Sequence, residues 1–187
     1  MTVWVDADSC PRRVRDIVAK GAVTRGFPVV YVANRAIPVT VPVPENGDGA
    51  PTDRDSGPVS SVSATLERIP VTVAWRNGPA LGVVAGDGDR GMTADDVILD
   101  LAVESDLVIT RDLPLAERAV ERGVWAMNDR GTIWTKDTVR ERRSVRDAAL
   151  YLRSTGVAEE SGPRSFSSRE VRQFAGAFDS FLQRHLS

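Results

Sequence analysis

The chain has 187 residues, a length typical of one domain, and 42% of them are apolar, which is enough for one hydrophobic core. A single cysteine excludes an intramolecular disulfide, and a single histidine, His185, removes most histidine-based hydrolase and zinc chemistry. No apolar run approaches the ~20 residues of a membrane span, and the first residues lack the pattern of a secretory signal. We therefore expect one cytoplasmic domain over residues 1–187 with no membrane partner.

The net charge of −2 conceals an uneven distribution of charge along the chain. Residues 1–110 carry 15 acidic and 10 basic side chains, whereas residues 111–187 carry 11 acidic and 14 basic ones. The most basic segment is 130–153. Its simplest interpretation is a solvated helix face, and the alternative is a surface that binds a polyanion such as nucleic acid.

A strand–helix–strand unit is predicted at the start of the chain. Residues 3–5 form a short apolar run, and Pro11 suits the first position of a helix that Gly26 can end. Residues 29–33 form a second buried strand. Because a helix connects the two strands, we expect them to be parallel.

The middle of the chain differs in composition. Residues 42–65 are rich in Pro, Gly, Ser and Asp and poor in large apolar residues, which predicts a flexible insertion. Residues 69–75 and 81–85 then resemble strands, and residues 86–91 form a glycine-rich loop. That loop lacks the features of a P-loop or of a dinucleotide-binding fingerprint, so we interpret it as a turn.

Strands and helices alternate through the next part of the chain. Thr93 can cap a helix, residues 107–110 form a buried strand, a helix opens at Asp112 and ends at Gly123, and residues 124–127 form another strand. The alternation predicts an α/β fold with a mainly parallel sheet.

Two helices are predicted to complete the chain. One covers residues 137–155, and the other opens at Ser167 with a capping box completed by Glu170.

Acidic residues follow strands or open helices at several points. Asp6 and Asp8 leave the first strand, Asp95 and Asp96 lie in the first turn of a helix, and Asp112 follows the strand at 107–110. Ligands of parallel α/β sheets bind beyond the carboxyl ends of the strands, where these groups are expected to meet. A cluster of carboxylates without His or Cys favours Mg²⁺ or Mn²⁺ over zinc.

Helix capping is the alternative explanation for most of these carboxylates. Asp8, Asp95 and Asp112 could each accept hydrogen bonds from the first amides of a helix. Asp6 is harder to explain in this way, because it ends a strand and no helix is expected to begin close enough for its side chain to cap it. Cys10 lies at an expected helix start, which favours a thiolate, but with no histidine near it in the sequence covalent catalysis is disfavoured.

Several motifs, taken in order, resemble the YaiI/YqxD family of uncharacterised bacterial proteins. The matching segments are 4–11, 32–34, 94–96, 106–116, 128–131, 146–147, 162–163 and 174–175, so the resemblance covers nearly the whole chain apart from about 42–90. It implies a PIN-like fold, a three-layer sandwich in which helices flank a parallel sheet. Better-known proteins of that fold are metal-dependent ribonucleases.

The resemblance also implies a set of site residues. The acidic cluster, which would be catalytic and metal-binding, comprises Asp6, Asp8, Asp95 and Asp112. Its substrate-binding rim comprises Asn34, Thr110, Arg111 and Arg130. The sequence departs from the family pattern in two places. Met92 stands where an Asp is usual, and Asp89 in the preceding loop is an acidic residue that could take its place. The second departure is the long insertion.

Three functions compete at this point. The first is an Mg²⁺- or Mn²⁺-dependent nuclease that cuts RNA or single-stranded nucleic acid. The second, motivated by Met92, is a nucleic-acid-binding or adaptor module without catalysis that uses Arg140, Arg142, Arg143 and Arg146. The third is a phosphatase with Asp6 as nucleophile and Asp8 as acid. It ranks last because phosphatases of the haloacid-dehalogenase type also need a lysine between their motifs, and no lysine occurs between Lys20 and Lys136.

Overall fold

A computed structural model describes most of the chain. The described residues are 1–34, 38–42, 61–65, 81–85, 93–154 and 166–186. Among the helices of these segments, none is long and apolar enough to cross a membrane.

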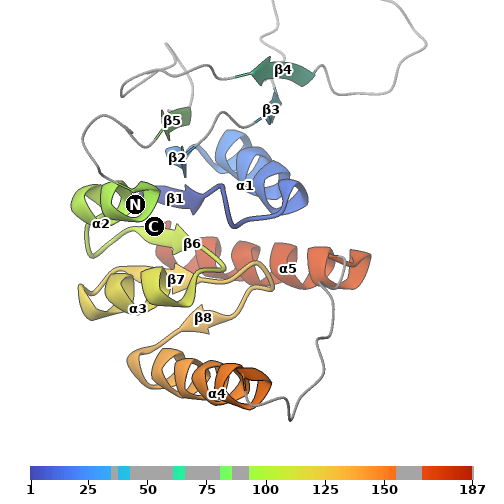
Figure 1. Cartoon of the computed structure of the whole chain (residues 1–187). Helices are drawn as coiled ribbons and strands as arrows, with labels where there is room; N and C mark the ends of the chain where they lie inside the picture. Colours follow the sequence, from blue (N-terminus) through green and yellow to red (C-terminus); the bar gives the residue numbers. More distant parts are fainter. Residues whose placement is uncertain (35–37, 43–60, 66–80, 86–92, 155–165, 187) are drawn as a thin grey trace, which may run out of the picture.

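The centre of the fold is a six-stranded sheet with the strand order β5-β2-β1-β6-β7-β8 (Figure 1). Its strands are β1 Val3–Asp6, β2 Val29–Ala33, β5 Leu81–Ala85, β6 Leu107–Ile109, β7 Trp125–Met127 and β8 Ile133–Trp134. The first five in the spatial order are parallel, and β8 pairs with β7 in the antiparallel direction. The mainly parallel sheet expected from the sequence is therefore confirmed.

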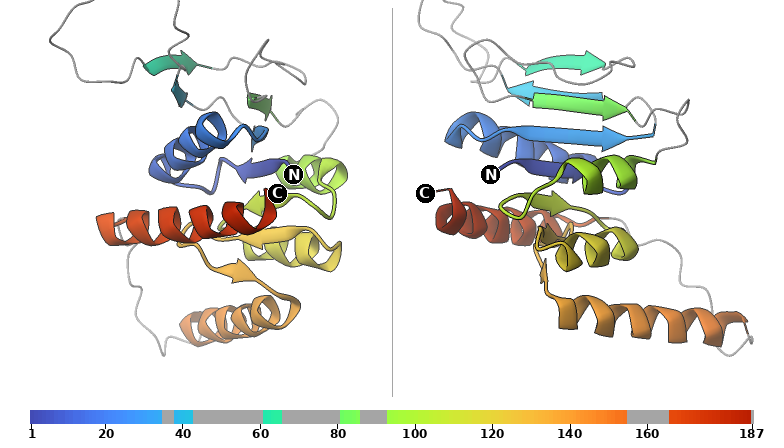
Figure 2. Two further views of the ribbon diagram at one scale, coloured as in Figure 1. Left: turned by 180° about the vertical axis from the view of Figure 1, so that it is seen from behind. Right: turned by 90° about the vertical axis from the view of Figure 1, so that its left-hand side faces the viewer.

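Helices cover both faces of the sheet. The helices are α1 Arg12–Arg25, α2 Ala94–Leu101, α3 Leu113–Glu121, α4 Lys136–Ser154 and α5 Ser168–His185. As Figure 2 shows, α1 and α5 lie on one face and α2 and α3 on the other, while α4 lies beyond β8 and packs beside α3. The α/β three-layer fold is thus confirmed.

The two-residue period of the strands explains the two hydrophobic cores. In β1, Val3 and Val5 point into the core beneath α1 and α5, whereas Trp4 points into the core beneath α2 and α3. Burial on both faces accounts for the nearly continuous apolar sequence of the inner strands.

The helix ends follow the signals in the sequence. Thr93 and Asp96 form a capping box at α2, Ser167 and Glu170 form another at α5, and Gly26 ends α1 in the left-handed conformation. Pro11 is the residue before the first helical position of α1 rather than the first helical residue itself.

Three short strands, β3 Pro38–Pro42, β4 Ser61–Thr65 and β8, were not predicted. β3 pairs with β4 as a separate antiparallel sheet, and β4 falls within the segment 42–65, whose composition indicates no strand. The two residues of β8 are too few to produce a sequence pattern. The rest of the expected insertion, the expected strand at 69–75 and the loop at 86–91 lie outside the described residues, so these remain predictions.

Asp106 fixes the amino end of the sheet through three hydrogen bonds. Its buried carboxylate accepts from the backbone N–H of Thr2 (2.6 Å), the indole N–H of Trp4 (2.9 Å) and the backbone N–H of Val103 (3.2 Å). The carboxylate therefore ties the start of β1 to the loop that precedes β6. A charged acceptor that is satisfied in this way contributes more to stability than a neutral one.

We expect Asp106→Ala to lower the free energy of unfolding by about 3 kcal/mol, because it leaves buried donors without an acceptor. Urea denaturation followed by far-UV circular dichroism measures this change. Asp100→Ala, at an exposed position of α2, is the matched control and should change stability by less than ~0.5 kcal/mol. Equal effects of the two substitutions would contradict a stabilising role for the hydrogen bonds of Asp106.

Candidate functional site

The carboxyl ends of four parallel strands bring polar residues to one edge of the sheet. Asp6 ends β1, Asn34 follows β2, Thr110 follows β6 and Asp129 lies two residues after β7. Ligands of parallel sheets bind at this edge. The predicted position of the site therefore coincides with a concentration of polar side chains.

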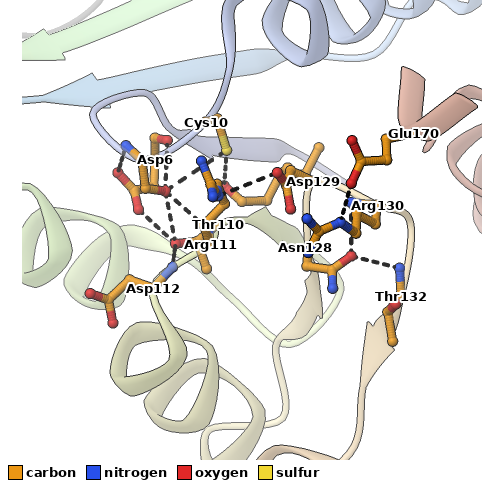
Figure 3. Close-up of polar contacts among 12 residues, drawn as sticks. Asp6, Cys10, Thr110, Arg111, Asp112, Asn128, Asp129, Arg130, Thr132 and Glu170 are labelled. Carbon is orange, nitrogen blue, oxygen red and sulfur yellow. Dashed lines mark hydrogen bonds and ion pairs between the residues drawn. The ribbon is translucent and has the colours of Figure 1, made fainter. Parts of the chain in front are cut away.

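Thr110 connects two of the predicted acidic residues. Its buried hydroxyl donates to Oδ2 of Asp6 (2.6 Å) and accepts the backbone N–H of Asp112 (2.9 Å), as Figure 3 shows. Asp6 is only 3% exposed, and its other carboxylate oxygen accepts the backbone N–H of Ser9 (3.3 Å). Thr110 is thus a positioning residue beneath the site, rather than an exposed residue of the rim.

Asn34 connects Asp8 to the start of α2. Oδ2 of Asp8 accepts the backbone N–H of Asn34 (2.6 Å) and its side-chain N–H (3.0 Å). The side-chain oxygen of Asn34 in turn accepts the backbone N–H of Ala94 (3.0 Å). Asp8 therefore does not cap the helix that follows it, and the amide of Asn34 holds two elements together.

Asp95 is influenced by carboxylates from distant parts of the chain. Partial burial, followed by the neighbouring charges of Asp6 and Asp112, raises the pKa of the Asp95 carboxyl to about 6. Asp112 also caps α3, because Oδ1 accepts the backbone N–H of Leu115 (3.1 Å). Capping and clustering thus both occur, and at Asp112 they occur in the same residue.

The cluster is compatible with a hydrated divalent cation, and the structure sets a limit on how such an ion is held. Like charges that raise the pKa of a neighbour would be relieved by a cation, and the available donors are all oxygens. Within the described part of the chain, no three His, Cys, Asp or Glu side chains are arranged to hold an ion together. An ion here would therefore have one or two carboxylate ligands and complete its shell with water and substrate oxygens, as Mg²⁺ commonly does.

A groove of about 760 Å³ opens beside the cluster. The lining residues are Asp8, Ser9, Arg111, Asp112, Leu113, Asn128, Asp129, Arg130, Trp134, Arg142, Val145, Arg146 and Ala149. The carboxyl edge of the sheet forms one wall, and α4 forms the other. Asp8 and Asp112 therefore line the groove, whereas the buried Asp6 and the partly exposed Asp95 are not among its lining residues.

Four of the arginines of α4 form two pairs with different surroundings. Arg140 and Arg143 form ion pairs with Glu121 and Glu117 of α3, and so hold α4 against that helix. Arg142 and Arg146 instead line the groove, and neither has an ion pair with any residue that the structure describes. Only the second pair is thus available to an anion in the groove.

The predicted rim arginines already have acidic partners. Nε of Arg130 donates to Glu170 at the start of α5 (2.7 Å), directed away from Asp6 in Figure 3. Hydrogen bonds from Ser167 and Arg130 lower the pKa of Glu170 to about 2. Nε of Arg111 lies 3.3 Å from Oδ2 of Asp129, although half of the Arg111 side chain is exposed.

Asp129 and Ser9 line the groove and were not among the predicted site residues. Asp129 is 3% exposed, burial raises the pKa of its carboxyl, and Oδ2 accepts no hydrogen bond within the described chain. Its place two residues after a predicted strand was the available signal. Ser9 accepts the backbone N–H of Arg111 through its hydroxyl (3.0 Å) and so joins the two loops at the edge.

Cys10 is not a reactive thiol. Burial and the nearby Asp6 charge raise the pKa of the Cys10 thiol, which opposes the thiolate that its position near a helix start favours. The thiol donates to the carbonyl of Ile109 (3.4 Å) and packs in the core beneath α1 and α5.

Comparison with known proteins agrees with this arrangement of motifs. The model of the family described as "Uncharacterized BCR, YaiI/YqxD family" matches residues 83–184. A UPF0178 protein of Treponema denticola is 35% identical over 191 residues, covering 100% of this chain and 97% of the relative. The chain belongs to the YaiI/YqxD family.

Further relatives extend over the same length. A UPF0178 protein of Geobacter sulfurreducens is 32% identical and covers 100% of this chain and 99% of the relative. One from Vibrio vulnificus is 32% identical over 97% of each chain. No solved structure matches this member of the YaiI/YqxD family. Met92 and Asp89, where the sequence departs from the family pattern, lie outside the described residues.

We expect the side chain of Asp95 to titrate with a midpoint of about 6 in carboxyl-detected NMR. Asp6→Asn or Asp112→Asn should lower that midpoint, because each removes a negative charge that disfavours ionised Asp95. Since the pKa is raised in the folded state, stability should fall as the pH rises from about 3.8 to about 6, and Asp95→Asn should remove that fall. An Asp95 midpoint that is the same in Asp6→Asn, Asp112→Asn and the native chain would show that the carboxylates are not clustered. Asp100→Asn is the control.

Proposed function

We propose that this YaiI/YqxD protein is an Mg²⁺- or Mn²⁺-dependent nuclease that hydrolyses phosphodiester bonds of RNA or single-stranded nucleic acid. The observation that carries the proposal is the groove, in which Asp8 and Asp112 face Arg142 and Arg146. Arginines bind the phosphates of a strand, and carboxylates on the opposite wall attract the cation that phosphodiester hydrolysis needs.

The metal would be held by one or two carboxylates of the predicted cluster, and water and substrate oxygens would complete its shell. The charges of Asp6 and Asp112 act on Asp95, and Asp8 is the fourth member of the cluster. Asp112 is the member that both acts on Asp95 and lines the groove. When bound, the ion would polarise a phosphoryl oxygen and lower the pKa of a bound water.

The chain's own residues bind and orient the strand. Arg142 and Arg146 would hold phosphates along α4, and Arg111 would exchange its contact with Asp129 for a phosphate at the carboxylate wall. Thr110 fixes Asp6 and the backbone of Asp112 relative to each other, so the acidic wall is organised before the substrate arrives.

A second function is favoured by one specific observation. Because no three potential ligands among the described residues are arranged around an ion, a module that binds nucleic acid without cutting it also agrees with the groove. The phosphatase hypothesis has less support. Asp6, its proposed nucleophile, is 3% exposed and both of its oxygens accept hydrogen bonds.

We expect the purified chain to cleave single-stranded RNA when Mn²⁺ or Mg²⁺ is present and not when EDTA is present. Asp112→Asn and Asp95→Asn should each reduce the cleavage rate by at least about a hundredfold, because they remove charge that stabilises the cation and the transition state. Denaturing gel electrophoresis of an end-labelled strand measures the rate.

Asp100→Asn is the control for cleavage, because it removes a carboxylate from an exposed position of α2. Metal-dependent cleavage that persists in the two variants would indicate a contaminating nuclease. If the chain binds the strand but does not cleave it with either Mn²⁺ or Mg²⁺, the binding module is the function that remains.

Arg142→Gln combined with Arg146→Gln should weaken binding of single-stranded RNA and reduce its dependence on salt. Each lost phosphate contact lowers the slope of log affinity against log salt by ~0.7, so the double variant should lose about 1.4. Arg140→Gln combined with Arg143→Gln removes the same charge from arginines that pair with α3, and should change the slope much less. Equal slopes for the two double variants would exclude a specific role for the groove.

A further inference from the structure

One side of the groove is apolar and aromatic. Trp134 of β8 lines the groove together with Leu113, Val145 and Ala149. The indole is partly buried and packs against the core that contains Val139, so its position is fixed by the fold. Part of an aromatic ring is therefore accessible in a groove whose other residues are mostly charged.

Core packing alone does not explain why this surface meets the groove. Val139, the first apolar residue of α4, is 1% exposed, whereas Trp134 lines the groove and Val145, further along the same helix, is 56% exposed. An aromatic ring beside arginines is the usual arrangement for binding single-stranded nucleic acid, since a base stacks on the ring while its phosphates contact the cations.

We propose that Trp134 is a stacking platform for an unpaired base, which makes single strands rather than duplexes the substrate of the groove. The inference rests on the proposed function, because it assigns the base that accompanies the phosphates at Arg142 and Arg146. A base within a duplex is already stacked between its neighbours, and it would have to leave that stack to reach the indole.

Charge complementarity selects the strand as the occupant. Arg142 and Arg146 are four residues apart on α4, so they lie one turn apart on the same side of the helix, and both line the groove with Trp134. Asp8, Asp112 and Asp129 on the opposite wall would repel an acidic peptide. A single strand can direct its phosphates to Arg142 and Arg146 and an uncharged base to the indole of Trp134.

The test compares two fluorescent strands of about ten units in EDTA, where no cleavage occurs. One strand is oligoadenylate, and the other has the same sugar-phosphate backbone without bases. Fluorescence anisotropy should show that the native chain binds oligoadenylate about tenfold more tightly than the abasic strand. Trp134→Leu should bind the two strands equally, whereas Trp134→Phe, which keeps a ring, should retain most of the preference.

Trp125→Leu is the matched control, because Trp125 is exposed at the start of β7, does not line the groove, and contacts Phe181 edge-to-face and His185 in a tilted arrangement. It should keep the full preference for bases. Circular dichroism confirms that each variant is folded, and the comparison of strands on the native chain needs no variant.

The two strands separate this inference from the proposed function. Binding of the abasic strand reports the phosphate contacts of Arg142 and Arg146, and the preference for bases reports Trp134. Equal binding of both strands by the native chain, or a preference that persists in Trp134→Leu, would overturn the stacking role while the proposed function stands. A native chain that binds neither strand would overturn both.

Discussion

The hydroxyl of Thr110 is the contact on which the acidic wall depends. Parallel pairing of β1 with β6 places Val5 opposite Ile109, so the next residues, Asp6 and Thr110, meet at the carboxyl edge. The hydroxyl has one proton and donates it to the Asp6 carboxylate, which leaves its lone pairs for the backbone N–H of Asp112. One side chain thus fixes two acidic residues that are distant in the sequence.

The same contact explains how a carboxylate can be buried beside other carboxylates. Burying the charge of Asp6 is unfavourable unless the group is hydrogen-bonded, and Thr110 and the backbone of Ser9 supply those bonds. Asp95 accepts no comparable hydrogen bond from the residues that the structure describes, and its partial burial, followed by the nearby charges of Asp6 and Asp112, raises the pKa of its carboxyl. Hydrogen bonds thus offset the burial of Asp6, whereas Asp95 lies partly buried near like charges.

Local signals predicted the strands of the parallel sheet and the helix ends, whereas tertiary packing decided the roles of individual residues. A capping residue acts within one turn, so Thr93, Asp112 and Ser167 were readable from the sequence. Sequence alone could not separate the arginines of α4, because Arg140 and Arg142 differ only in whether their helix face meets α3 or the groove. The groove could not be predicted from the sequence either, because α4 lines it only after the chain reverses direction between β7 and β8.

That reversal builds the second half of the site. The side-chain oxygen of Asn128 accepts the backbone N–H groups of Arg130 and Thr132 (both 2.9 Å), as Figure 3 shows. Gly131 takes a φ of 83°, and a Cβ there would collide with Ala177 of α5. The turn directs β8 antiparallel to β7, which places Trp134 and α4 across from the carboxyl edge. The parallel strands thus position the carboxylates, and one turn that requires glycine positions the arginines of α4 and the ring of Trp134 opposite them.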